Sequence, residues 1–194
     1  MTVTLIPGDA LIIVDVQNDF LPGGSLPVPG GNYIIPVLNQ YIAGFYTRRL
    51  PIIATRDWHP DDHCSFRQYG GDWPPHCIAN SEGADFAPGL ALPVYSNIIS
   101  KATTQDKEAY SAFSNTQLNA LLQSFQVKRV FVGGLATEYC VLNTVKDAIQ
   151  YQYAVFILKD AVCAINRQPE DGRLAIAEMK HLGATSIYCE DLVV

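Results

Sequence analysis

Positively charged side chains are scarce in this sequence. Lys and Arg number 13 against 19 Asp and Glu, which gives a formal net charge of −6 in a chain where only 16% of residues are charged. Proteins that bind nucleic acids hold the phosphates with clustered Lys and Arg. The acidic balance therefore argues against a nucleic-acid partner.

Long apolar runs and paired cysteines are also missing. No apolar stretch approaches the roughly 18 residues of a membrane span, and the stretch from Met1 to Ala10 lacks the basic segment of a secretory signal. The five cysteines are an odd number without paired spacing, which suits a reducing compartment better than a disulfide framework. We therefore expect a cytoplasmic protein that does not bind membranes.

Apolar residues, in contrast, are abundant. They make up 48% of the sequence, enough to build a large core and to exclude intrinsic disorder. A chain of 194 residues has the length of one α/β domain with an insertion. We therefore expect a single domain over residues 1–194. We also consider a homo-oligomer of this domain.

Short β-rich runs alternate with longer helical stretches. Most runs are continuously apolar, as in parallel strands buried on both faces. The expected strands are Ala10–Val16, Pro51–Thr55, Val94–Ser100, Arg129–Gly133, Ala154–Leu158 and Ser186–Cys189. The expected helices are Asn32–Arg48, Thr116–Gln126, Glu138–Gln150 and Glu170–Leu182, with Gly183 as the stop of the last. This order predicts an α/β fold with three αβα layers and a doubly wound, mostly parallel sheet of about six strands.

One segment, from Asp57 to Pro93, breaks the alternation. It is rich in Gly, Pro, Asp and His, and it holds both tryptophans and three of the four histidines. Loops longer than about 12–15 residues inside compact domains are usually functional or disordered. Because the aromatic content argues against disorder, we expect an ordered functional insertion over about residues 57–93.

Four reactive side chains stand where predicted strands end or just beyond, namely Asp15, Asp57, Lys101 and Cys140. Open α/β sheets bind their ligands at the carboxyl ends of the strands. Each of these residues alone is more often structural or a surface residue. Their agreement at four strand ends indicates a functional site.

Cys140 is the most informative of the four. Thr137 is a suitable N-cap, which predicts that Cys140 lies in the first turn of the helix Glu138–Gln150. The amides and dipole of a helix N-terminus favour a thiolate, and they could also stabilise an oxyanion. The alternative is a small buried hydrophobic residue, which is our interpretation of Cys163 and Cys189.

A cysteine nucleophile needs a base, and histidine is the usual choice. His181, the one histidine outside the insertion, falls late in a predicted helix and far from the strand ends. Asp15 is then the candidate base, with Lys101 holding its charge and position. A lone carboxylate is a weak base for a thiol unless the site shifts both pKa values.

The insertion also offers metal ligands and aromatic walls. Asp57, His59, His63 and His76 supply a carboxylate and imidazoles, donors that suit Zn, Fe or Mn, although a loop with exposed histidines explains the spacing equally well. Aromatic side chains could line a pocket, but they are more often part of a core. The aromatic candidates are Phe20, Trp58, Trp73 and Tyr110.

Several stretches together resemble the isochorismatase-like cysteine hydrolases and, within them, the nicotinamidase/pyrazinamidase family. The matching stretches are Ile13–Phe20, Thr55–Pro60, Asp72–Cys77, Ser100–Lys101, Tyr110–Phe113 and Gly133–Val141. The most specific pieces are Asp-Trp-His at 57–59 and Trp-Pro-Pro-His at 73–76, because relatives outside the nicotinamidases usually lack that metal site.

This resemblance implies a role for each candidate in the catalytic centre. Asp15, Lys101 and Cys140 match a catalytic triad. The bond between Leu135 and Ala136 matches a cis peptide that directs the backbone amides of Ala136 and Cys140 at the oxyanion.

The resemblance also implies a metal site and a substrate pocket. Asp57, His59 and His76 match the ligands of one divalent ion, and His63 matches a ligand that only some members use. The residues that match the walls around a pyridine ring are Phe20, Trp73 and Tyr110.

The implied activity is hydrolysis of nicotinamide, and of pyrazinamide, to the acid and ammonia through a cysteine thioester, in NAD salvage. The first alternative is another hydrolase of the superfamily, acting on an N-carbamoyl compound or a vinyl ether. A flavin or nucleotide binder needs a phosphate-binding loop after the first strand, and residues 16–19 do not provide one. A metal-binding or redox-sensing protein is the remaining alternative.

Overall fold

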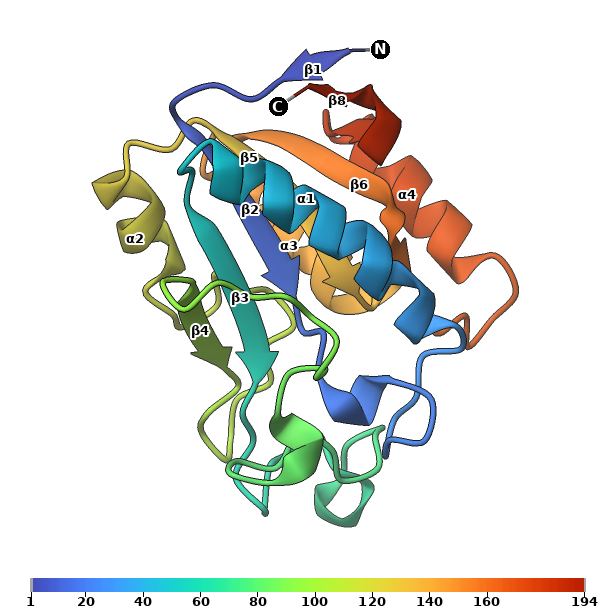
Figure 1. Ribbon diagram of the computed structural model, residues 1–194. Coiled ribbons are helices and arrows are strands. Elements are labelled where there is room, and N and C mark those ends of the chain that lie inside the picture. Colours follow the sequence, from blue (N-terminus) through green and yellow to red (C-terminus); the bar gives the residue numbers. More distant parts are fainter. Residues whose placement is uncertain (1, 194) are drawn as a thin grey trace.

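The computed structural model describes residues 2–193 and has a six-stranded parallel sheet at its centre (Figure 1). The strand order is β4-β3-β2-β5-β6-β7. The strands are β2 Asp9–Val14, β3 Ile52–Asp57, β4 Asn97–Lys101, β5 Arg129–Leu135, β6 Ala154–Cys163 and β7 Thr185–Ile187. The chain winds outward in one direction from β2 and in the other from β5, so the doubly wound parallel sheet of the prediction is confirmed.

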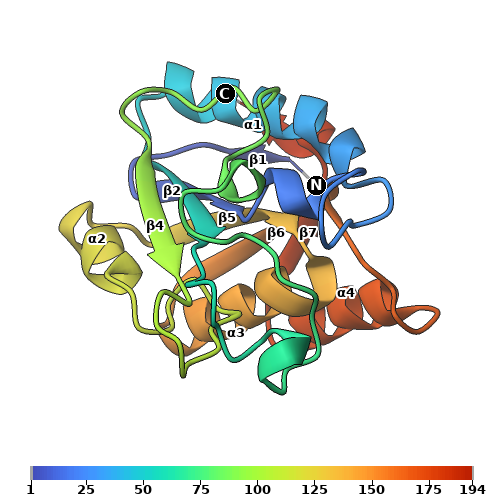
Figure 2. The same ribbon diagram turned by 90° about the horizontal axis from the view of Figure 1, so that it is seen from below.

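Helices cover both faces of this sheet (Figure 2). One face carries α1, Ile35–Thr47, and the other carries α2, Leu118–Ser124, α3, Leu142–Gln150, and α4, Asp171–His181. Strand β2 shows why its sequence is continuously apolar. Leu11 and Ile13 belong to the core under α1, while Ile12 and Val14 belong to the core under the other helices.

Most boundaries differ from the predictions by one to a few residues, and β6 continues past the predicted end at Leu158 as far as Cys163. Val94 is fully exposed, and the third strand of the sheet in chain order begins only at Asn97. The first predicted helix begins as a 3-10 turn over Gly31–Ile34. The helix that follows β5 begins as a π-helical turn, Thr137–Val141, which Ala136 precedes without any side-chain cap. The prediction that Thr137 caps a regular α-helix was therefore wrong.

Two short strands were not predicted. Strand β1, Val3–Thr4, pairs in parallel with β8, Leu192–Val193, and so joins the two ends of the described chain. Two residues are too few for any periodic pattern to show in the sequence.

The segment between β3 and β4 is mostly loop, with 3-10 turns at Arg67–Tyr69 and Glu82–Ala84. Figure 1 shows its first part, with both 3-10 turns, gathered beyond the end of the sheet to which the β3 arrow points, before the chain returns to the start of β4. Buried Asp19 fixes part of it, since Asp19 Oδ2 accepts a 2.7 Å hydrogen bond from the backbone amide of Cys77. The long loop therefore lies where parallel strands present their ligands.

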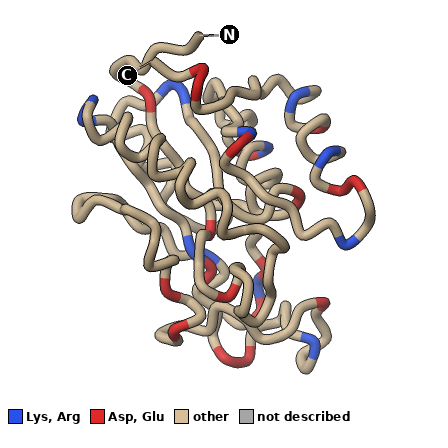
Figure 3. Tube along the Cα trace, turned by 45° about the vertical axis from the view of Figure 1, so that its right-hand side comes forward, with Lys and Arg blue, Asp and Glu red and all other residues tan. Residues whose placement is uncertain are grey.

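Charged residues are spread along the trace, and Figure 3 shows no continuous stripe of Lys and Arg in that view. No helix among residues 2–193 has both the length and the apolar character to cross a membrane.

A glycine in β5 tests how tightly the centre of the sheet is packed. Gly134 has a φ of +122°, and a Cβ atom there would lie 2.1 Å from the carbonyl oxygen of Val14. We expect Gly134→Ala to lower the free energy of unfolding by about 3 kcal/mol or more, measured by urea denaturation. Gly183→Ala is the control, because its φ is +111° with no neighbour within 4 Å, and it should cost only about 1 kcal/mol. Equal losses in the two variants would contradict the steric argument.

Candidate active site

The sheet brings the four reactive residues of the sequence analysis together. Asp15 directly follows β2, Asp57 and Lys101 end β3 and β4, and Cys140 lies in the π-helical turn after β5. The register of β3 and β4 pairs Asp57 directly with Lys101. All four side chains are buried.

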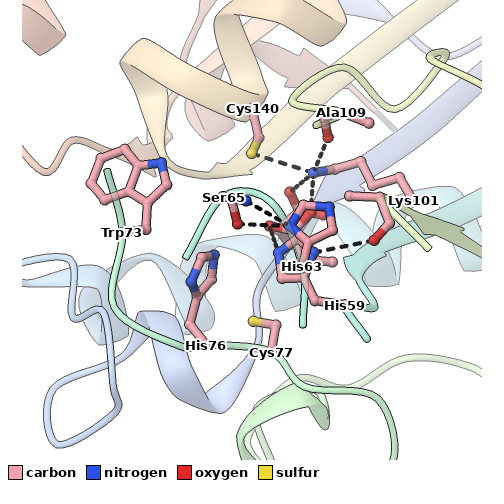
Figure 4. Close-up of polar contacts among 12 residues, drawn as sticks. His59, His63, Ser65, Trp73, His76, Cys77, Lys101, Ala109 and Cys140 are labelled. Atoms are coloured by element: carbon pink, nitrogen blue, oxygen red, sulfur yellow. Dashed lines mark hydrogen bonds and ion pairs between the residues drawn. The ribbon is translucent and has the colours of Figure 1, made fainter. Parts of the chain in front are cut away.

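Lys101 is the residue that contacts the other three (Figure 4). Its Nζ forms a short ion pair with Asp57 and lies 3.0 Å from Asp15 Oδ2 and 3.4 Å from Cys140 Sγ. Nζ also donates to the carbonyl oxygen of Ala109 at 3.1 Å. Burial alone would lower the pKa of Lys101, but the two carboxylates raise it well above its ordinary value. Lys101 is therefore a fixed ammonium ion.

Asp15 occupies a drier environment than an ordinary carboxylate. Its Oδ1 accepts a 2.6 Å hydrogen bond from the Thr55 hydroxyl. Burial raises the pKa of Asp15, and the charge of Asp57 adds to the rise while Lys101 opposes it. Asp15 is consequently a stronger base than a carboxylate in water.

Cys140 does not have the lowered pKa that a helix N-terminus predicts. Burial raises the pKa of its thiol well above the ordinary value, Lys101 opposes the rise, and the charges of Asp15 and Asp57 add to it. The expectation that the helix N-terminus makes this thiol ionise more easily was therefore wrong, because burial, together with the two carboxylates, outweighs the ammonium ion. The peptide bond between Leu135 and Ala136, just before this turn, is cis.

Beside the ammonium lies a group of metal-binding side chains. The ligand atoms of Asp57, His59 and His76 all lie within 4.8 Å of one another, and the three residues are buried. Nδ1 of His59 faces the carbonyl oxygen of Ala102 at 3.1 Å, and Nδ1 of His76 faces that of Pro74 at 2.8 Å. Because a carbonyl oxygen only accepts, each Nδ1 carries the hydrogen and each Nε2 offers a lone pair.

The unused atoms of this group fit a divalent cation. Nε2 of His59 is buried and finds no hydrogen-bond partner in the described chain, and Asp57 Oδ2 lies 3.7 Å from it. An ion with bonds of about 2.1 Å to both atoms spans such a gap.

The charges around these ligands also favour a cation. Burial would raise the pKa of Asp57, but Lys101 and His59 hold it well below its usual range. Burial lowers the pKa of His76 to about 4. Burial alone would lower the pKa of His59 as well, but the Asp57 carboxylate raises it. The set is thus one ionised carboxylate, a neutral His76 and a His59 ring beside a carboxylate that favours a positive charge there, which a bound cation supplies in place of a ring proton.

His63 has a different position. Its ring stacks on His59 at 4.2 Å, but both of its nitrogens are in use (Figure 4). Nδ1 lies 2.8 Å from the Ser65 hydroxyl and Nε2 lies 3.1 Å from the carbonyl oxygen of Lys107. The hydrogen on Nε2 leaves no lone pair there for an ion, so in this arrangement His63 packs against His59 outside the group of Asp57, His59 and His76.

A pocket opens onto Cys140, Asp57 and His76. Its walls include the three aromatic residues that the family resemblance implies, Phe20, Trp73 and Tyr110. Trp73 Nε1 donates a 2.9 Å hydrogen bond to the Tyr110 hydroxyl, which fixes both rings. Trp58, which we had also considered for a pocket wall, packs instead under the guanidinium of Arg56, 3.6 Å from the ring centroid.

Other residues of the site escaped the sequence analysis. The pocket is also lined by Leu26, Tyr139 and Ile165, of which only Tyr139 carried a signal, as the neighbour of Cys140. Gln17 is buried and holds Asp57 by its backbone, accepting from the Asp57 amide and donating to its carbonyl oxygen, both at 2.8 Å. Its place next to the first strand end was the only available hint.

The different positions of His76 and His63 lead to a prediction about metal content. We expect His76→Ala to lose most of a bound divalent ion, because it removes one of three protein ligands. His63→Ala should retain the ion, since neither nitrogen of His63 is free to bind it. Elemental analysis of both purified proteins measures this, with His181→Ala as a control remote from the sheet ends. Full metal occupancy in His76→Ala would show that the ligand set is wrong.

Comparison with known proteins places this geometry in a family. Residues 9–191 match the Isochorismatase domain. The nicotinamidase of Escherichia coli (strain K12) is 38% identical over 92% of this chain and 94% of its own. The pyrazinamidase of Pyrococcus horikoshii, solved in complex with zinc, is 50% identical with a TM-score of 0.90 and covers 94% of this chain and 99% of that chain.

A second solved structure is similar over the whole chain. The L. infantum protein in complex with nicotinate has a TM-score of 0.92 and 38% identity, and the match covers 100% of this chain and 99% of that chain. The domain match and these relatives extend over nearly the full length, well beyond the motifs around the site. The chain therefore belongs to the isochorismatase family.

Proposed function

We propose that this protein is a nicotinamidase, a cysteine amidohydrolase that converts nicotinamide to nicotinate and ammonia, and also hydrolyses pyrazinamide, in NAD salvage. The observation that carries the proposal is the contact of Lys101 with Asp15 and Cys140 at the end of an aromatic pocket. Relatives over nearly the whole chain bear the names nicotinamidase and pyrazinamidase. Residues 1–194 act as one hydrolase domain, with the insertion as its metal-binding part.

The protonation states of the site suit a thiol nucleophile that ionises only as it attacks. Asp15 has a raised pKa and lies with Cys140 in one buried group of ligand atoms. The Cys140 thiol is neutral at rest, so Asp15 removes its proton while the sulfur bonds to the amide carbon. Lys101, 3.4 Å from the sulfur, stabilises the negative charge that develops there.

Asp15 carries the protons between the sulfur, the leaving nitrogen and water. The thiolate adds to the amide carbon, and the backbone amides of Ala136 and Cys140 bind the resulting oxyanion. Asp15 returns its proton to the leaving nitrogen, so that ammonia departs and a thioester to Cys140 remains. Asp15 then takes a proton from water, whose oxygen attacks the thioester. The tetrahedral intermediate expels the sulfur, and Asp15 returns to it the proton taken from water. The acid leaves the pocket and loses its own proton to solvent, which gives the carboxylate.

Asp57, His59 and His76 hold one divalent ion in this proposal, either Zn, Fe or Mn. When bound, the ion supplies a Lewis acid beside the pocket that can accept the ring nitrogen of nicotinamide. The protein orients Nε2 of His59 and His76 towards the ion, and Lys101 keeps Asp57 ionised.

We also propose that the enzyme works in the cytoplasm. All five cysteines in the described chain are free thiols. A reducing compartment protects such thiols from oxidation and from disulfide formation.

The direct test of the activity is ammonia release from nicotinamide by the purified protein, with metal analysis of the same sample. Pyrazinamide keeps a nitrogen at the matching ring position and should be hydrolysed with comparable efficiency. Benzamide keeps the amide but lacks that nitrogen, and its kcat/KM should be lower by a factor of up to about 10⁴. Absence of ammonia release from nicotinamide in the metal-loaded protein would refute the proposal.

Replacement of the nucleophile tests the mechanism. We expect Cys140→Ala to abolish turnover while the protein stays folded, because the thioester cannot form without the sulfur. Mass spectrometry of the rapidly quenched wild type should detect the nicotinoyl group on Cys140. Cys64→Ala is the matched control, since Cys64 lies outside the pocket lining and should keep full activity. Substantial turnover by the Cys140 variant would end the covalent mechanism.

A further inference from the structure

Arg167 is a charged residue at the rim of the pocket for which the proposed reaction has no role. It belongs to the loop between β6 and α4, two residues after Ile165, which lines the pocket. Its side chain is 49% exposed, so it can move without disturbing the core.

The loop that carries Arg167 is tied to the turn that carries the nucleophile. The backbone amide of Asn166 donates a 2.7 Å hydrogen bond to Glu138 Oε1, and Glu138 lies two residues before Cys140. The Asn166 side chain in turn accepts from the amide of Gly172, at 2.9 Å, near the start of α4. The backbone next to Arg167 is therefore fixed relative to the catalytic turn.

From this fixed base, the Arg167 side chain reaches the opposite wall. Its Cζ lies 5.1 Å from the ring centroid of Trp73, and its Nη1 lies 3.7 Å from Asp72 Oδ2. Trp73 and Asp72 belong to the insertion, which lies nearly a hundred residues away in sequence. Trp73 also meets the ring of Tyr139 edge-on at 5.1 Å, so the aromatic wall joins the insertion to the catalytic turn.

The charge of Arg167 also acts on this second ring. Burial raises the pKa of Tyr139, and the proximity of Arg167 opposes that rise. Arg167 thus contacts Trp73 of the insertion and opposes the rise in the pKa of Tyr139 in the catalytic turn. Both rings line the pocket.

We propose that Arg167 is a positioning residue that holds Trp73 of the insertion against the catalytic turn and so closes the aromatic pocket around the substrate ring. The inference rests on the proposed function, because it assigns a binding role at the same site. A guanidinium over a tryptophan face is attracted by the ring quadrupole and stacks on it in a way that an ammonium cannot fully reproduce. The exposed ion pair with Asp72 contributes little by comparison.

The kinetic test compares Arg167→Met, Arg167→Lys and Arg173→Met with the wild type, using nicotinamide as substrate. Arg173 is the matched control, because it is an exposed arginine paired with Glu170 at the start of α4. We expect Arg167→Met to raise KM about 2–5-fold without a fall in kcat, since an exposed cation–π contact has that strength. Arg167→Lys should lie between it and the wild type, and Arg173→Met should be unchanged.

A second measurement does not depend on turnover. In a Trp58→Phe background Trp73 is the sole tryptophan. Quenching of its fluorescence by acrylamide measures how accessible the Trp73 ring is to solvent. Arg167→Met should increase this quenching in the ligand-free protein, whereas Arg173→Met should not. An unchanged KM together with unchanged quenching overturns the inference, and so does an equal effect of Arg173→Met. Failure of the wild type to hydrolyse nicotinamide refutes the proposed function, while the quenching still decides the role of Arg167.

Discussion

The site depends on one buried ammonium ion held between two carboxylates. Transfer of Lys101 from water into the protein is costly unless its charge is compensated, and Asp15 and Asp57 compensate it from two neighbouring strands. This requirement fixes the carboxyl ends of β2, β3 and β4 relative to one another. Cys140 comes within reach of the same ammonium because β5 lies next to β2 on the other side.

Asp57 connects the catalytic group to the metal ligands. One of its oxygens pairs with Lys101, and the other faces His59 at 3.7 Å. Two carboxylates and one ammonium leave a net negative charge in a buried space, which a divalent cation at His59 and His76 would compensate. The electrostatics around Cys140 and around the metal-binding side chains are therefore coupled through Asp57. Gln17 holds Asp57 in place through its backbone.

Much of this arrangement could be predicted from the sequence, because parallel strands buried on both faces leave continuous apolar runs such as that of β2. The reactive residues could be found for the same reason, since strand ends of a parallel sheet meet at one edge. The π-helical turn at Cys140 could not be predicted, because a single turn leaves no periodic pattern in the sequence. The raised pKa of Cys140 could not be predicted either, because it depends on burial and on the charges of Asp15 and Asp57. Leu26 and Ile165 reach the pocket only through the path of their loops, which no local pattern encodes.

The two carboxylates share one ammonium but differ in their other neighbours, and this difference assigns their roles. Lys101 holds the pKa of Asp57 low and the two imidazoles add to this effect, so Asp57 stays a permanent anion suited to an ion. Burial raises the pKa of Asp15 and the charge of Asp57 adds to the rise, while Lys101 and the Thr55 hydroxyl offset only part of it. A carboxylate that must accept and return a proton needs a pKa closer to that of its partners than a permanent anion does. The environment therefore favours Asp15 over Asp57 as the proton carrier of the proposed mechanism, although Lys101 contacts both residues.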